Sequence, residues 1–214
     1  MKKSSPSILS RLANIRVPFP LLLLGVAVLG YAALSPALGF YWDDWQILYL
    51  QGLAGPDGFW AYFAHDRPLS AWTYILASNL LGSSPLPWHL FSLALRCLTA
   101  LGLWWAFRGI WPERKSLAGW SALLFLFYPV FRQQPMAAVY SQHWMCYVLV
   151  AFSLATMVWA LRRFDEDHWL HPLARALAAL ALFTTDYYAG MELFRAAVLF
   201  VMAPRELPQR KRIV

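Results

Sequence analysis

Long apolar runs are the feature that most constrains how this chain can fold. The first run, residues 17–38, is about 22 residues long, which is enough for a helix to cross roughly 30 Å of hydrocarbon. Over the whole sequence 60% of the residues are hydrophobic and only 14% are charged, whereas soluble domains are about one quarter charged. The sequence therefore predicts an all-α protein, a polytopic bundle of membrane helices.

Six apolar stretches are predicted to span the membrane. They are residues 17–38, 88–107, 117–131, 140–161, 172–186 and 189–203. The last two come from one apolar region of about 31 residues, which is too long for one ordinary span and too short for two full ones. We predict a hairpin there, because its centre carries Asp186 and small residues suited to a turn. Residues 17–204 then form one multi-span domain, although the first run could instead be a signal peptide.

Basic residues flank these runs and predict the orientation of the bundle. They cluster in residues 1–16, 108–115, 162–163 and 205–212. Because cytoplasmic flanks carry an excess of Lys and Arg, we predict a multi-pass protein of the cell membrane with both termini cytoplasmic. Residues 1–16 would be the leader and residues 205–214 the tail. Basic residues that flank membrane spans explain the net charge of +7, so we expect the lipid bilayer as a partner and no nucleic acid.

The long segment between the first two spans, residues 39–87, is predicted to be an exoplasmic loop. It is not apolar enough to span, and it contains aromatic-rich stretches around Trp45 and Phe59. Aromatic rings are enriched at the membrane–water boundary, so these stretches predict short interfacial helices. Asp43 followed by Gln46 resembles a capping box at the start of the first helix.

Asp43 and Asp44 are the predicted catalytic residues. They follow the first span directly, within the sequence GFYWDDW. Adjacent carboxylates need not share a helix face, so one could cap the following helix while the other points into a cleft. Partial burial there would raise its pKa toward the working range of a general base. The alternative is that both are solvated acids at the interface.

His65, Asp66 and Arg67 form a second cluster in the same loop. The planar fork of an arginine could hold a phosphate, and a histidine could do the same or bind a metal. The alternative is that Arg67 pairs with Asp66 or with lipid headgroups. The spacing of these residues matches no recognised metal-ligand pattern, so we assign no metal site and no cofactor, and a divalent metal stays an open alternative.

Four ionisable residues fall within the predicted spans: Arg96, Asp186, Glu192 and Arg195. Such groups are costly in a membrane unless they face protein or water, which makes them functional candidates. Arg96 lies deep in its span and needs a partner, for which we expect Asp186 or Glu192. Glu192 and Arg195 are three residues apart on one helix and could simply neutralise each other. The short arms of the hairpin predict that Asp186 is sheltered below the outer surface.

The order of these features resembles the GT-C glycosyltransferases, a superfamily of multi-span enzymes that includes the dolichyl-phosphate-mannose protein mannosyltransferases. The resemblance rests on four segments in order: YWDDW at 41–45, DRPLSAWTY at 66–74, GSSPLPWHLFSLALR at 82–96 and DYYAGMELFR at 186–195. It covers nearly all of the chain, but members of the superfamily usually have more spans. The resemblance therefore implies the N-terminal part of a longer enzyme, a split transferase, or a small relative that needs a second membrane subunit.

The resemblance also implies a site at the outer membrane surface, where loop helices rest on the bundle. The donor would be a sugar on polyprenyl phosphate, and the acceptor a glycan, lipid or protein hydroxyl. Asp43 or Asp44 would deprotonate or orient that hydroxyl. The substrate-binding set would be His65, Asp66, Arg67, Arg96, Asp186, Glu192 and Arg195. The competing class is a non-enzymatic polytopic membrane protein, an assembly partner or small transporter, whose acids cap helices and whose buried charges hold the bundle together.

Overall fold

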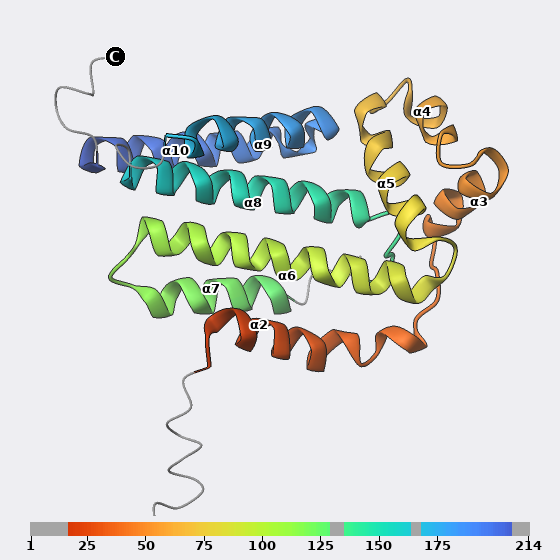
Figure 1. The fold of residues 1–214 in the computed structure, drawn as a ribbon, viewed down its shortest axis with the longest axis horizontal. Coiled ribbons are helices and arrows are strands. Elements are labelled where there is room, and N and C mark those ends of the chain that lie inside the picture. The colour runs from red at the N-terminus through yellow and green to blue at the C-terminus, as the bar shows by residue number, and fades with distance from the viewer. Residues whose placement is uncertain (1–16, 129–134, 164–167, 207–214) are drawn as a thin grey trace, which may run out of the picture.

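A computed structural model describes residues 17–128, 135–163 and 168–206, and within them the regular elements are helices, with no strand (Figure 1). The all-α prediction is confirmed for this part of the chain. Six helices of the described residues lie side by side and form the bundle: α2 (Phe19–Ala27), α6 (Pro85–Ile110), α7 (Lys115–Phe127), α8 (Ser141–Arg162), α9 (Leu170–Thr184) and α10 (Ala189–Glu206). The predicted leader 1–16, the end of the predicted span 117–131 and most of the predicted tail lie outside the described residues.

Among the described residues, three helical segments are long and apolar enough to cross a membrane: Phe19–Ala37, Pro85–Ile110 and Ser141–Arg162. The first is α2 extended by a π-helical turn and a short 3-10 turn. α7 and α9 are apolar but shorter. α10 has 18 residues but carries several charged side chains, among them Glu192 and Arg195. The fold is thus consistent with a membrane helix bundle.

α6 and α8 form the centre of the bundle because small residues let their backbones approach closely. A Cβ atom added to Gly102 of α6 would lie 2.9 Å from the Cβ of Ala151 on α8, and one added to Gly109 would overlap Val158. Ala106, between the two glycines, is completely buried. On this central pair, α2 and α7 pack on one side and α9 and α10 on the other (Figure 1).

Three shorter helices, α3 (Asp44–Ala54), α4 (Gly58–Phe63) and α5 (Ala71–Leu81), sit together at one end of the bundle (Figure 1). We call them the loop helices, and they occupy the loop in which short helices were predicted. Phe59 and Phe63 of α4 stack on Tyr74 of α5, with ring centroids 5.5 and 5.2 Å apart. The Tyr74 hydroxyl donates a hydrogen bond to the carbonyl of Val139 at 2.8 Å, which fixes the loop helices to the start of α8.

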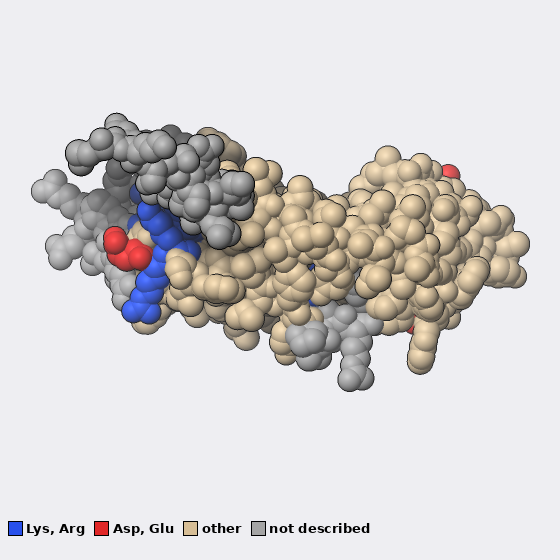
Figure 2. All heavy atoms as spheres, turned by 90° about the horizontal axis from the view of Figure 1, so that it is seen from below, with Lys and Arg blue, Asp and Glu red and all other residues tan. Residues whose placement is uncertain are grey.

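Basic side chains gather at the opposite end. Figure 2 shows Lys and Arg mainly at the end away from the loop helices, while the middle of this face carries little charge. The described basic residues at that end include several from the end of α6, the start of α7 and the end of α8: Arg108, Arg114, Lys115, Arg162 and Arg163. The bundle therefore has a basic end and a loop-helix end.

Candidate functional site

Asp44, the first residue of α3, ties the loop helices to the segment before α8. Its side chain is completely buried. Oδ1 accepts hydrogen bonds from the backbone N–H groups of Ala138 at 2.9 Å and Val139 at 2.8 Å, and Oδ2 accepts one from Tyr41 at 3.3 Å. Burial raises the pKa of the Asp44 carboxyl, and these backbone bonds partly oppose that rise. Because both oxygens are engaged, Asp44 acts as an anchor in this structure.

Asp43 is exposed beside this anchor. It occupies the N-cap position of α3 but its side chain makes no cap hydrogen bond, so the predicted capping box is wrong. The preceding residue, Trp42, has a backbone φ of 51°, a left-handed conformation that is rare for a bulky residue, and its side chain is 82% exposed. The turn that Asp44 anchors thus presents Trp42 and Asp43 outward, and both residues are exposed.

Arg67 lies on a stack of rings built from three distant parts of the chain. Its guanidinium carbon is 5.4 Å from the ring centroid of Tyr187, in the turn between α9 and α10. Tyr187 stacks on His143 of α8 with centroids 6.1 Å apart and planes 6° apart, and the His143 centroid is 5.3 Å from that of Tyr140. We call Arg67, Tyr187, His143 and Tyr140 the ladder. Tyr187 is exposed, so this end of the ladder can contact a sugar, and the guanidinium can bind a phosphate.

The donors of Arg67 are only partly used. Nε donates to Oδ2 of Asp66 at 2.7 Å, so the alternative that Arg67 pairs with Asp66 holds. The Asp66 side chain is itself 68% exposed, which makes this a weak pair that orients the arginine. Within the described residues, the two Nη atoms of Arg67 have no hydrogen-bond partner, so they can hold an anion. His65 is exposed beside this pair and joins no contact in the ladder.

The segment from Ala137 to His143 connects the turn that carries Asp43 and Asp44 with the ladder. Asp44 binds the N–H groups of Ala138 and Val139, and the next residue, Tyr140, is the first ring of the ladder. The same segment is held from α6, where Ser92 Oγ donates to the Ala137 carbonyl at 2.9 Å. Asp43 and Arg67 therefore belong to one braced structure at the loop-helix end.

Asp186 lies at the same end, directly before Tyr187, but it is exposed. The prediction that its neighbours shelter it is wrong, because the short 3-10 turn Asp186–Tyr188 leaves its side chain exposed between α9 and α10.

Glu192 and Arg195 lie further along α10 and pair with each other, with Arg195 Nε 2.7 Å from Glu192 Oε2. Arg195 also donates from Nη2 to Ser153 Oγ on α8 at 2.8 Å. This is the mutual neutralisation that their spacing suggested. The two residues join α10 to α8 and take no part in the ladder.

Arg96 is buried inside the bundle, where its guanidinium carbon lies 4.8 Å from the ring centroid of Tyr31 and 5.4 Å from that of Trp144. The ion pair expected with Asp186 or Glu192 does not form among the described residues. Two aromatic faces stabilise the cation in its place. Arg96 thus joins α6 to α8 and to the turn after α2, apart from the loop-helix end.

His143 and Tyr187 are functional candidates that no sequence pattern indicated. They lie far apart in the chain, and neither has a characteristic neighbour. The sequence feature that could have pointed to Tyr187 was the pair of tyrosines in the DYYAG turn, which lies between α9 and α10. The second phenol, Tyr188, has its hydroxyl 3.0 Å from His143 Nδ1 and so holds the histidine in place.

Within the part of the chain that the structure describes, no group of three or more His, Cys, Asp or Glu residues is placed to hold a metal ion. Comparison of the chain with protein-family models, with curated proteins and with solved structures finds no match.

Proposed function

We propose that this protein is a membrane glycosyltransferase of the GT-C kind, or part of one, which transfers a sugar from a polyprenyl-phosphate donor to an acceptor hydroxyl at the exoplasmic face. Two features that attach to the same segment before α8 carry the proposal. Asp44 binds Ala138 and Val139 and leaves its neighbour Asp43 exposed, and His143 and Tyr140 belong to the ladder that ends in the Arg67 guanidinium.

The proposed topology has six spans, formed by α2 and α6 to α10, with both termini cytoplasmic in the cell membrane. The separation of charge in Figure 2 supports it, because the basic end would face the cytoplasm and the loop helices the outside. α7 and α9, with 13 and 15 residues, are about 20 and 22 Å long at 1.5 Å per residue. Their neighbours in the bundle would cover the rest of the membrane thickness around them.

In the proposed reaction the acceptor hydroxyl attacks the anomeric carbon of the donor. Its proton passes to Asp43, the acid whose oxygens are free of structural bonds. The bond from the anomeric carbon to the lipid phosphate oxygen breaks, and the electron pair leaves with the phosphate. Arg67 stabilises the charge that develops there through its Nη atoms, with Asp66 orienting it. A single displacement of this kind inverts the anomeric centre. Asp186 serves as a second acid near the sugar.

The test uses the full chain in liposomes with polyprenyl-phosphate mannose and, separately, polyprenyl-phosphate glucose, and measures sugar transfer. Asp43→Asn should lower transfer by about 100-fold or more, the usual contribution of a general base, without reducing the folded yield. Asp57→Asn, which changes another exposed acid of the same loop, is the matched control and should leave transfer unchanged. Wild-type transfer by Asp43→Asn would refute the assigned role.

The second candidate is a non-enzymatic membrane protein, such as an assembly partner. It is favoured by the structural use of the ionisable groups in the bundle: Asp44 accepts three backbone bonds, Glu192 pairs with Arg195, and Arg96 lies on two rings. Absence of transfer with either donor, both by the wild-type chain alone and by the chain together with any membrane subunit that co-purifies with it, would support this candidate over the first.

A further inference from the structure

A groove lies between α9 and α10, and no residue of the ladder lines it. Both helices pack on α8, but they make little contact with each other. The space between them is a cavity of about 420 Å³, which Met157 of α8 also lines. Most of its walls are apolar or small, yet four ionisable side chains face it: His171 and Arg175 from α9, and Glu192 and Arg195 from α10. Ionisable groups gathered between apolar helices indicate a specific ligand.

Among the described residues, the groove carries one more cationic than anionic side chain: Arg175 and Arg195 face it together with Glu192. Arg195 is already matched, because Nε pairs with Glu192 at 2.7 Å and Nη2 donates to Ser153 Oγ at 2.8 Å. Arg175 is exposed to the groove and forms no ion pair with any residue in the described ranges. An anion in the groove would therefore be held by Arg175.

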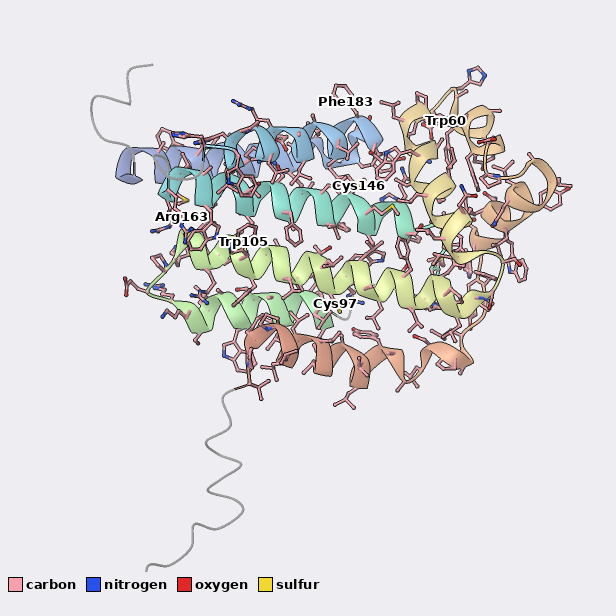
Figure 3. The ribbon with its side chains drawn as sticks, in the orientation of Figure 1. Trp60, Cys97, Trp105, Cys146, Arg163 and Phe183 are labelled. Carbon is pink, nitrogen blue, oxygen red and sulfur yellow. The ribbon has the colours of Figure 1, made fainter. Side chains whose placement is uncertain are left out.

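The position of Arg175 along the bundle suits a lipid headgroup. Trp169, just before α9, is 60% exposed, and exposed tryptophans sit at headgroup level in membrane proteins. Arg175 lies about 9 Å further along α9, within reach of that level for a long side chain. This is the basic end of the bundle, where Figure 3 labels Arg163, whereas Phe183 marks the end of α9 nearest the loop helices. The groove is thus separate from the Arg67 ladder.

The groove has room for a lipid headgroup, because its cavity of about 420 Å³ can hold a phosphate with its adjoining glycerol. A zwitterionic headgroup would place its own cation beside two arginines, whereas an anionic phospholipid would compensate the excess charge. We propose that this groove binds the phosphodiester headgroup of an anionic phospholipid, with Arg175 as its main contact.

The test is native mass spectrometry of the purified full chain in detergent, titrated with phosphatidylglycerol or phosphatidylcholine. Phosphatidylglycerol should bind about tenfold more tightly, and Arg175→Gln should remove that preference, since a charge-assisted bond to phosphate is lost. Arg108→Gln is the matched control, because Arg108 lies on the Trp104 ring outside the groove, 5.4 Å from its centroid, and should leave binding unchanged. Glu192→Gln should tighten binding, because it removes the carboxylate that competes for Arg195.

Several results would overturn the proposal. Equal binding of the two lipids, equal behaviour of Arg175→Gln and Arg108→Gln, or weaker binding after Glu192→Gln would each contradict it. Displacement of the lipid by excess inorganic phosphate would show a site for the free ion. Efficient crosslinking of Ala179→Cys, in the groove wall, to a second polypeptide in native membranes would show a protein occupant. Thermal unfolding of each variant shows whether it is folded. If Arg175→Gln does not fold, the lipid binding of Glu192→Gln still tests the proposal.

Discussion

Replacing Asp44 should detach the loop helices from the start of α8. Asp44→Ala removes the acceptor for three backbone N–H groups, those of Ala138, Val139 and Tyr41, at 2.9, 2.8 and 3.3 Å. Asp44→Asn is milder, since its single carbonyl oxygen can still accept from Ala138 and Val139. Its amide group would then face the Tyr41 N–H, donor against donor.

The expected magnitude follows from the two short bonds. Hydrogen bonds to a charged group contribute about 1.5–3 kcal/mol each, which gives about 3–6 kcal/mol for the pair. Part of this is offset by the cost of burying the carboxylate, which also raises its pKa. We therefore expect Asp44→Ala to lower the free energy of opening this contact by about 2–4 kcal/mol, and Asp44→Asn by about 1 kcal/mol.

Amide hydrogen exchange is the direct assay, because the N–H groups of Ala138 and Val139 exchange only when the contact opens. A loss of about 2–4 kcal/mol corresponds to exchange that is roughly 30- to 700-fold faster. Asp43→Asn is the control: its side chain is exposed and makes no cap bond, so exchange should stay within about twofold. If Asp44→Ala exchanges these amides no faster than Asp43→Asn, the anchoring role of Asp44 is refuted.

Two further predictions concern pH and helix packing. Burial raises the pKa of the Asp44 carboxyl, so the native protein keeps the carboxyl proton to higher pH than the unfolded chain does. The free energy of unfolding should therefore fall as pH rises above the ordinary pKa of 3.8, and it should level off above the native pKa. Unfolding titrations of wild type and Asp44→Asn should show this slope only in wild type, and identical slopes would contradict it. Gly102→Ala should destabilise the bundle by about 1–3 kcal/mol by pushing α6 from α8. Gly25→Ala, where an added Cβ meets nothing within 4 Å, should be neutral or stabilising in thermal unfolding, and equal effects of the two would refute the close packing.

The sequence was sufficient to predict the helices, because length and apolarity are local properties of a run. The predicted span 88–107 lies within α6, Pro85–Ile110, and the predicted span 140–161 nearly coincides with α8. The loop with short aromatic helices was equally visible from its composition. The absence of a capping box could not be predicted, since the orientation of the Asp43 side chain depends on the turn that Asp44 holds.

Long-range partners could not be predicted. Asp44 binds the backbone N–H groups of Ala138 and Val139, and almost every residue type has such a group, so the sequence does not indicate which ones are bound. For Arg96 the expected partner was an acid, yet two aromatic rings lie against it, because a cation in an apolar bundle can be stabilised by ring faces as well as by a carboxylate. The ladder depends on how three separate segments meet, which no spacing rule encodes.

The orientation of the bundle is the claim on which the site, the donor and the proposed function all depend. It can be measured with a single cysteine in place of Asp43, because the native Cys97 and Cys146 are buried and give little background. A membrane-impermeant thiol reagent added to intact cells should label position 43, while Lys115→Cys at the basic end should be labelled only after permeabilisation. Labelling of Lys115→Cys in intact cells, with position 43 protected, would place the loop helices in the cytoplasm and contradict the account.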